Sequence, residues 1–106
     1  MTKHMFITHL TNCHNLGVKA QCIEYLHNIT RLSNDLCSKI VNSLWGCSNP
    51  KYFGNNIYNL LKASADSDNS VQFEPKTKSI GCTVYIIYPD EHAAAYALYK
   101  IKQFKS

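Results

Sequence analysis

Two cysteines and two histidines in the first quarter of the chain have the side chains that bind zinc. Cys13, His14, Cys22 and His27 supply thiol and imidazole groups, which are preferred zinc donors. These four are not spaced as the short C-x-x-C or H-x-x-x-H pairs of common structural sites. Cys22 also belongs to an apolar helical stripe, where a buried free thiol is common. We therefore predict no metal site and no cofactor.

Nucleophilic catalysis is the second chemistry to consider. A cysteine nucleophile needs a histidine within hydrogen-bond reach and a third group that orients it. Five cysteines and five histidines offer many pairs, and none stands out. The chain lacks a glycine-rich phosphate loop, a nucleophile elbow and a clustered carboxylate pair. We predict that the protein is not an enzyme.

The stretch NPKYFGNNIYNLLK, residues 49–62, combines an apolar stripe with an unusual polar face. As a helix of 100° per residue, it gathers four apolar side chains on one side: Phe53, Ile57, Leu60 and Leu61. The opposite side holds Lys51, Asn55, Tyr58, Asn59 and Lys62, with Tyr52 and Asn56 toward the edges. Asparagine can make paired hydrogen bonds to adenine, and lysine and tyrosine side chains can hold phosphates. The apolar side is core, and the polar side suits a nucleic acid.

The distribution of acidic residues agrees with that chemistry. No Asp or Glu lies between Leu36 and Ala65, a segment that includes Lys39, and none lies between Pro75 and Pro89, which includes Lys76 and Lys78. A carboxylate against phosphates would cost affinity, whereas lysines release counterions. The net charge of +4 also favours an anionic partner.

Length and composition predict one intracellular domain. A chain of 106 residues can bury a single modest core. No apolar run approaches the roughly 20 residues that cross a bilayer, and no secretory signal is visible. Five irregularly spaced cysteines favour reduced thiols. The predicted location is the cytoplasm, or the host cytoplasm or nucleus if the source is viral, as an asparagine- and lysine-rich composition suggests.

Local patterns predict three helices in the first part of the chain. Residues 1–16 are interpreted as a lead-in, with a short strand or irregular segment at residues 5–10. A first helix starts from Gly17, because apolar residues recur at helical spacing. Ser33 caps a second, and Gly46 ends it in the left-handed conformation. The third covers residues 50–63, since Pro50 suits a first helical turn.

The rest of the chain predicts a hairpin and a last helix. Residues 64–70 form a polar loop. Residues 71–74 and 82–88 have strand patterns, joined by a turn at residues 75–81. Residues 89–106 form a C-terminal helix rich in alanine.

This order of elements resembles the winged helix-turn-helix superfamily over residues 17–88. The resemblance implies an α+β fold of three helices followed by a β-hairpin wing, with an additional C-terminal helix. It also implies that residues 50–63 enter the major groove and that the tip at residues 75–81 rests on the DNA backbone. The segment at residues 44–48 is longer than the tight turn of compact members, which leaves the angle of the third helix open.

We accordingly expect a sequence-selective duplex DNA-binding protein, a small regulator of transcription. Asn55 and Asn59 would contact base edges, and Lys51, Lys62, Lys76 and Lys78 would hold the backbone. The predicted DNA-binding set is completed by Tyr52, Tyr58, Asn56 and Lys39, of which the two tyrosines would reach phosphates through their hydroxyls. The C-terminal helix could form a homodimer seam. The alternative is a phage- or virus-type protein that inhibits a host protein through its tyrosine- and asparagine-rich face. Salt dependence separates the two, because only DNA binding should weaken steeply.

Overall fold

The chain begins with a helix rather than with a lead-in. The computed structural model describes residues 2–46, 50–63, 70–73, 84–87 and 99–104. Helix α1 (Lys3–Leu16) is capped by Thr2, whose Oγ1 accepts a hydrogen bond from the N–H of Met5 (3.1 Å). Gly17 ends it in the left-handed region, with φ 72°, where glycine has no steric penalty.

The predicted strand or irregular segment at residues 5–10 is therefore wrong. Phe6, Leu10 and Cys13 are all buried, and their spacing of four and three residues is that of one helix face. The β-branched residues Ile7, Thr8 and Thr11 lower helix propensity locally. Burial of the apolar face outweighs that preference.

The next two helices confirm the prediction. Helix α2 (Lys19–Thr30) and helix α3 (Asn34–Trp45) have the expected apolar faces. Ser33 caps α3, and its Oγ accepts a hydrogen bond from the N–H of Leu36 (3.2 Å). The helix ends at Gly46 as predicted, but the predicted left-handed conformation is wrong, because Gly46 has φ −96° and ψ −8° and so lies in the right-handed region.

The predicted third helix is the fourth helix of the chain. It starts as one 3-10 turn, η1 (Pro50–Tyr52), and continues as α4 (Phe53–Ala63). The 3-10 turn fits a helix start at proline, which has no N–H to donate. The predicted core face is confirmed, since all four of its residues are fully buried: Phe53, Ile57, Leu60 and Leu61.

Two short strands follow and pair antiparallel. Strand β1 (Ser70–Phe73) and strand β2 (Val84–Ile87) are in a register that sets Ser70 opposite Ile87 and Phe73 opposite Val84. They overlap the predicted strands, while the predicted turn with Lys76 and Lys78 lies outside the described residues. Of the predicted C-terminal helix, residues 99–104 are described. Residues 99–102 are helical, whereas Gln103 and Phe104 form a turn and a bend, so the helix ends before them.

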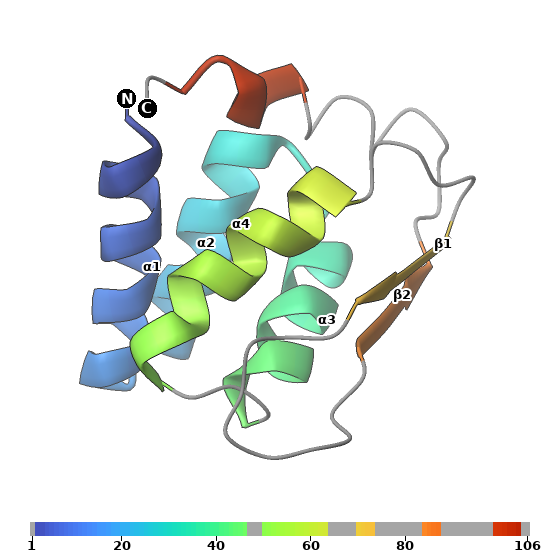
Figure 1. Ribbon diagram of the computed structural model, residues 1–106. Coiled ribbons are helices and arrows are strands. Elements are labelled where there is room, and N and C mark those ends of the chain that lie inside the picture. The colour runs from blue at the N-terminus through green and yellow to red at the C-terminus, as the bar shows by residue number, and fades with distance from the viewer. Residues whose placement is uncertain (1, 47–49, 64–69, 74–83, 88–98, 105–106) are drawn as a thin grey trace.

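Helices α1 to α4 pack around one hydrophobic core, in the arrangement of Figure 1. Helices α1, α2 and α3 lie side by side and α4 crosses in front of them, with the strand pair beside α3 and α4. Residues 99–104 lie over one end, near the N-terminus. The radius of gyration is 12.5 Å, near the roughly 13 Å of a compact chain this long. None of the described helices is long and apolar enough to cross a membrane.

Candidate nucleic-acid interface on α4

One polar stripe remains exposed on α4 and its leading turn. Lys51, Asn59 and Lys62 are exposed, and Asn55 is half-buried. Their spacing of four, four and three residues places them on one side of the helix. Because the opposite side is fully buried, this stripe is the surface that α4 offers to a partner. We call these four residues the α4 stripe.

Asn56 does not belong to this surface. Its side chain is 0 % exposed and interacts with neighbouring groups. The prediction that it helps to contact DNA is therefore wrong. A buried amide needs hydrogen-bond partners inside the protein, so Asn56 has a structural role.

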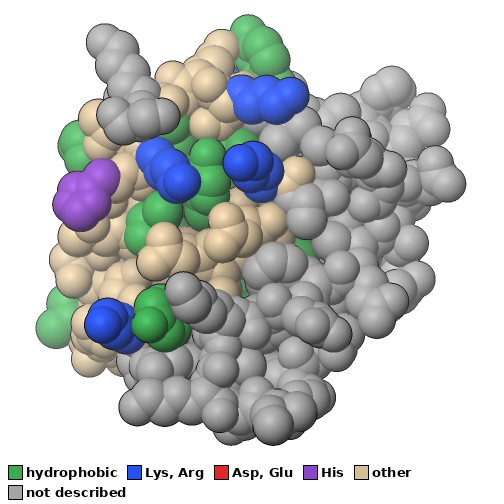
Figure 2. Space-filling model, in the orientation of Figure 1, with side chains coloured by type: hydrophobic (Ala, Val, Ile, Leu, Met, Phe, Trp, Pro, Cys, Tyr) green, Lys and Arg blue, Asp and Glu red, His purple; other side chains and the backbone are tan. Residues whose placement is uncertain are grey.

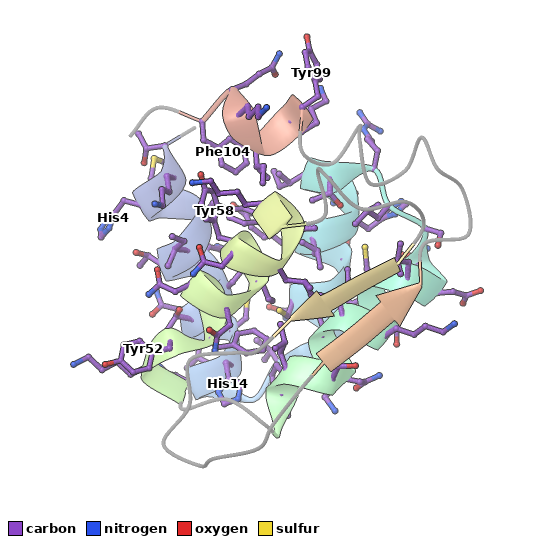
Figure 3. All side chains as sticks on the ribbon, turned by 45° about the vertical axis from the view of Figure 1, so that its right-hand side comes forward. His4, His14, Tyr52, Tyr58, Tyr99 and Phe104 are labelled. Atoms are coloured by element: carbon purple, nitrogen blue, oxygen red, sulfur yellow. The ribbon has the colours of Figure 1, made fainter. Side chains whose placement is uncertain are left out.

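The two tyrosines of the predicted site also differ from each other. The Tyr58 ring meets the Phe6 ring of α1 edge-on, with centroids 6.5 Å apart, and is half-buried. Tyr52 lies at the outer edge of the molecule beside the start of α4 (Figure 3). The Lys51 Nζ atom is 5.8 Å from the centre of the Tyr52 ring. Tyr52 thus remains beside the stripe, whereas Tyr58 packs against α1.

Helix α1 contributes a cation that sequence reasoning missed. The Nζ atom of Lys3 lies 4.7 Å from the centre of the Tyr58 ring, in the range of a cation–π interaction. This contact places a positive charge of α1 beside α4. The helical spacing of Phe6, Leu10 and Cys13 was the signal that could have revealed α1.

The surroundings of the stripe are positively charged. Within the described residues the only acids are Glu24 on α2 and Asp35 on α3, so α1, α4 and residues 99–104 carry none. Figure 2 shows Lys or Arg side chains and no Asp or Glu on the coloured part of this face. Asp66, Asp68, Glu74, Asp90 and Glu91 lie outside the described residues. The described part of this surface thus carries lysines and no acid, which suits an anionic partner.

Three further lysines belong to the predicted site, and one of them lies within the described residues. Lys39 is exposed on α3, on the side opposite the core-facing residues of that helix. Lys76 and Lys78 lie outside the described residues.

Two of the four candidate zinc ligands, His14 and His27, make hydrogen bonds to backbone carbonyl oxygens. The Nε2 atom of His14 is 2.9 Å from the carbonyl oxygen of Trp45, and Nδ1 of His27 is 2.6 Å from that of Leu32. A carbonyl oxygen can only accept, so each of these nitrogens carries the hydrogen. Among the residues described, no group of three His, Cys, Asp or Glu could hold a metal ion.

The described cysteines are core residues. Burial raises the pKa of Cys22 to about 12 and that of Cys37 to about 11, and nearby Cys13 and Cys37 thiols add to the shift at Cys22. Both thiols stay protonated at neutral pH, which removes the thiolate that acts as a nucleophile.

No family model, no curated protein and no solved structure matches this chain.

Proposed function

We propose that this protein binds duplex DNA through the α4 stripe, in a winged helix-turn-helix-like arrangement. The observation that carries the proposal is the row of exposed Lys51, Asn59 and Lys62, with half-buried Asn55 between them, on a helix whose other face is buried. The absence of acids from the described parts of α1 and α4 supports an anionic partner.

The stripe is long enough to span a DNA groove. Lys62 comes eleven positions after Lys51, which corresponds to about 16 Å along a helix axis at 1.5 Å per residue. The major groove is about 12 Å wide. A helix seated in it therefore has lysines near the phosphates at both margins. Asn55 and Asn59 fall between these lysines, where base edges would lie.

The assignment of roles follows from exposure. Asn59 and Asn55 are the candidates for base contacts, since paired hydrogen bonds to adenine suit an amide. Lys51, Lys62 and Lys3 are the candidates for phosphate contacts. Tyr52 can add a hydroxyl at the start of the helix. Lys39, Lys76 and Lys78 remain additional candidates for backbone contact.

The strand pair provides the second element of the proposal. Strand β1 lies against α4, which is where a wing would flank a groove-binding helix. A role in transcription and a location in the cytoplasm, or in a viral host's nucleus, follow as expectations from DNA binding. Dimerisation through residues 89–106 is a separate expectation. Within the described residues of that segment, Ile101 is buried in the protein's own core.

The alternative, a host-protein inhibitor, depends on an exposed tyrosine face. Aromatic side chains that bury a large area are the anchors of such interfaces. The Tyr58 ring instead packs on Phe6, so the face of α4 presents lysine and asparagine more than tyrosine. This packing favours DNA over a protein partner.

The test is fluorescence anisotropy of labelled mixed-sequence duplex DNA over a salt series, comparing the wild type with Lys51→Gln/Lys62→Gln. We expect wild-type affinity to fall steeply with salt. The double variant should bind more weakly, and its log–log salt slope should be smaller by about 2, because two phosphate contacts are lost.

A matched control removes the same net charge elsewhere. Ala20→Glu/Gln21→Glu places two acids in the first turn of α2, where both positions are exposed and the helix dipole favours negative charge. This variant should keep the wild-type salt slope. If Lys51→Gln/Lys62→Gln and Ala20→Glu/Gln21→Glu weakened DNA binding equally, the effect would come from net charge alone. That result would contradict the α4 interface. No binding by the folded wild type at low salt would overturn the proposal.

A further inference from the structure

A cavity of about 330 Å³ lies between the end of α2 and the C-terminal segment, apart from the α4 stripe. Six of the residues that the structure describes line it: Asn28, Ile29, Arg31, Lys100, Gln103 and Phe104. They come from two short segments, residues 28–31 and 100–104, that are distant in the chain. Two cations, two amides, one aromatic ring and one aliphatic side chain thus share one cavity.

The lining is divided into an apolar and a polar part. Ile29 and Phe104 are half-buried and pack against the core, so they form the floor. The Phe104 ring also lies 5.0 Å from the Phe6 ring, centre to centre, which fixes its position. Asn28, Arg31 and Gln103 are exposed and stand at the rim. A pocket with an apolar floor and a few polar groups is the usual form of a small-ligand site.

The charge of the lining is positive. Arg31 and Lys100 each contribute one positive charge, and no acid is among the six lining residues. Arginine presents a planar set of donors that matches a carboxylate or a phosphate. Asn28 and Gln103 can donate further hydrogen bonds from their amide nitrogens.

Arg31 occupies a backbone conformation that disfavours arginine. It ends α2 with φ 63° and ψ 10° and is the sole non-glycine residue with positive φ in the described part of the chain. Glycine or asparagine would fit this position with less strain. A strained residue kept at the rim of a cavity is consistent with a role for its side chain in binding.

Two carbonyl oxygens in the last turn of α2 accept hydrogen bonds from residues at the end of the helix. The N–H of Arg31 donates to the carbonyl of His27 (2.8 Å), and the hydroxyl of Thr30 donates to the carbonyl of Leu26 (2.7 Å). These bonds satisfy part of the negative end of the helix. The electrostatic repulsion between the C-terminal end of α2 and a bound anion is therefore smaller.

We propose that this cavity binds a small aromatic anion, that is, a planar ring carrying a carboxylate or a phosphate. The ring lies on Ile29 and Phe104, and the anionic group is held by Arg31 and Lys100. The proposal is independent of DNA binding by α4.

The test uses two probe pairs on the full-length protein. Adenosine 5′-monophosphate and benzoate are the anionic probes, and adenosine and benzamide are their neutral counterparts. Binding is measured by isothermal titration calorimetry, and its place by NMR shifts of the Asn28 and Gln103 side-chain amides. We expect at least one anionic probe to bind, and its neutral counterpart to bind about tenfold more weakly or not at all.

Arg31→Gly is the decisive variant, because it removes the guanidinium group and relieves the backbone. We expect the Kd of the anionic probe to rise about tenfold or more, with a melting temperature equal to or above that of the wild type. Lys100→Gln should also weaken binding. Lys39→Gln on α3 and the pair Lys51→Gln/Lys62→Gln should leave it unchanged.

Each outcome bears on the proposal. Tighter binding of the phosphate probe or of the carboxylate probe would support it and identify the anionic group. Equal affinity for charged and neutral probes, or unchanged affinity in Arg31→Gly, would overturn it. Loss of binding in the α4 variant alone would assign the anion to the α4 stripe and would also overturn it. Absence of binding by all probes would do the same.

Discussion

Three asparagines within five positions of α4 have three different environments. Asn59 is exposed, Asn55 is half-buried and Asn56 is fully buried. Neighbouring residues on a helix point about 100° apart, so residue type alone does not separate a base-contacting amide from a structural one. Burial therefore removes Asn56 from the seven predicted residues of this segment, and the Tyr58 ring is engaged by Phe6. Lys51, Tyr52, Asn55, Asn59 and Lys62 remain the candidates.

The core thiols provide a prediction at the same scale. Cys13, Cys22 and Cys37 are buried and free, and burial raises the pKa of all three thiols. In a variant with Cys47→Ser and Cys82→Ser, we expect no rapid reaction of the native protein with Ellman's reagent at pH 8. Three thiols should react in urea, because unfolding restores the thiolate.

The direction of the pH dependence follows from the same shifts. The folded pKa values of Cys22 and Cys37, about 12 and about 11, lie above the unfolded value of 9.0. Below pH 9 both states hold the thiol protons, so this contribution to stability is fully present. It is lost as pH rises from 9 toward 11 to 12, because the unfolded state releases protons first. In the labelling experiment, rapid reaction of the folded Cys47→Ser/Cys82→Ser variant with Ellman's reagent at pH 8 would contradict the burial of these thiols.

At the scale of elements, the close approach of α1 and α4 defines the interface. The N–H of Gly54 donates to Oγ1 of Thr11 (3.0 Å). A Cβ atom at Gly54 would collide with the carbonyl oxygen of Ile7 and would lie 2.6 Å from Thr11 Oγ1. The two helix backbones can approach this closely only because residue 54 has no side chain.

Gly54→Ala should therefore lower the free energy of unfolding by about 1–3 kcal/mol or more, the usual range for overpacking a rigid contact. Urea unfolding followed by circular dichroism measures it. The displacement of α1 should also move Lys3 away from Tyr58 and weaken DNA binding.

Gly46→Ala is the matched control for that change. Gly46 has a right-handed conformation and nothing within 4 Å of an added Cβ atom. We expect it to be neutral or to stabilise by about 0.4–1 kcal/mol, through a smaller entropy of the unfolded chain. Equal stability of the two alanine variants would show that α1 and α4 are not in close backbone contact.

At the scale of the whole molecule, the C-terminal segment completes the core. Ile101 is 1 % exposed, and the Phe104 ring packs on Phe6 of α1. Residues 99–104 thus lie over one end of the helical core, against α1 (Figure 1). This contact also builds the cavity beside Arg31, because neither segment forms it alone.

Ile101→Ala should cost about 2–5 kcal/mol of stability, the range for removing a fully buried aliphatic side chain. Lys102→Ala, at an exposed neighbouring position, should change stability by less than about 0.5 kcal/mol. Thermal unfolding of both variants measures the difference. A near-neutral Ile101→Ala would mean that the C-terminal segment is not part of the core.

The amino-acid sequence by itself determined the elements that local rules govern. The apolar spacing of α2, α3 and α4, the Ser33 cap and the proline start of η1 depend on residues within one or two turns. Helix α1 was missed for a local reason as well, because its β-branched residues obscured the spacing of Phe6, Leu10 and Cys13.

Only the tertiary structure decided which polar residues of α4 stay accessible. Gly54 and Thr11 are 43 positions apart, and their contact brings α1 over the side of α4 that carries Tyr58. The cavity beside Arg31 likewise joins residues 28–31 to residues 100–104. Such neighbours are set by packing of distant segments into one core, which no local pattern contains.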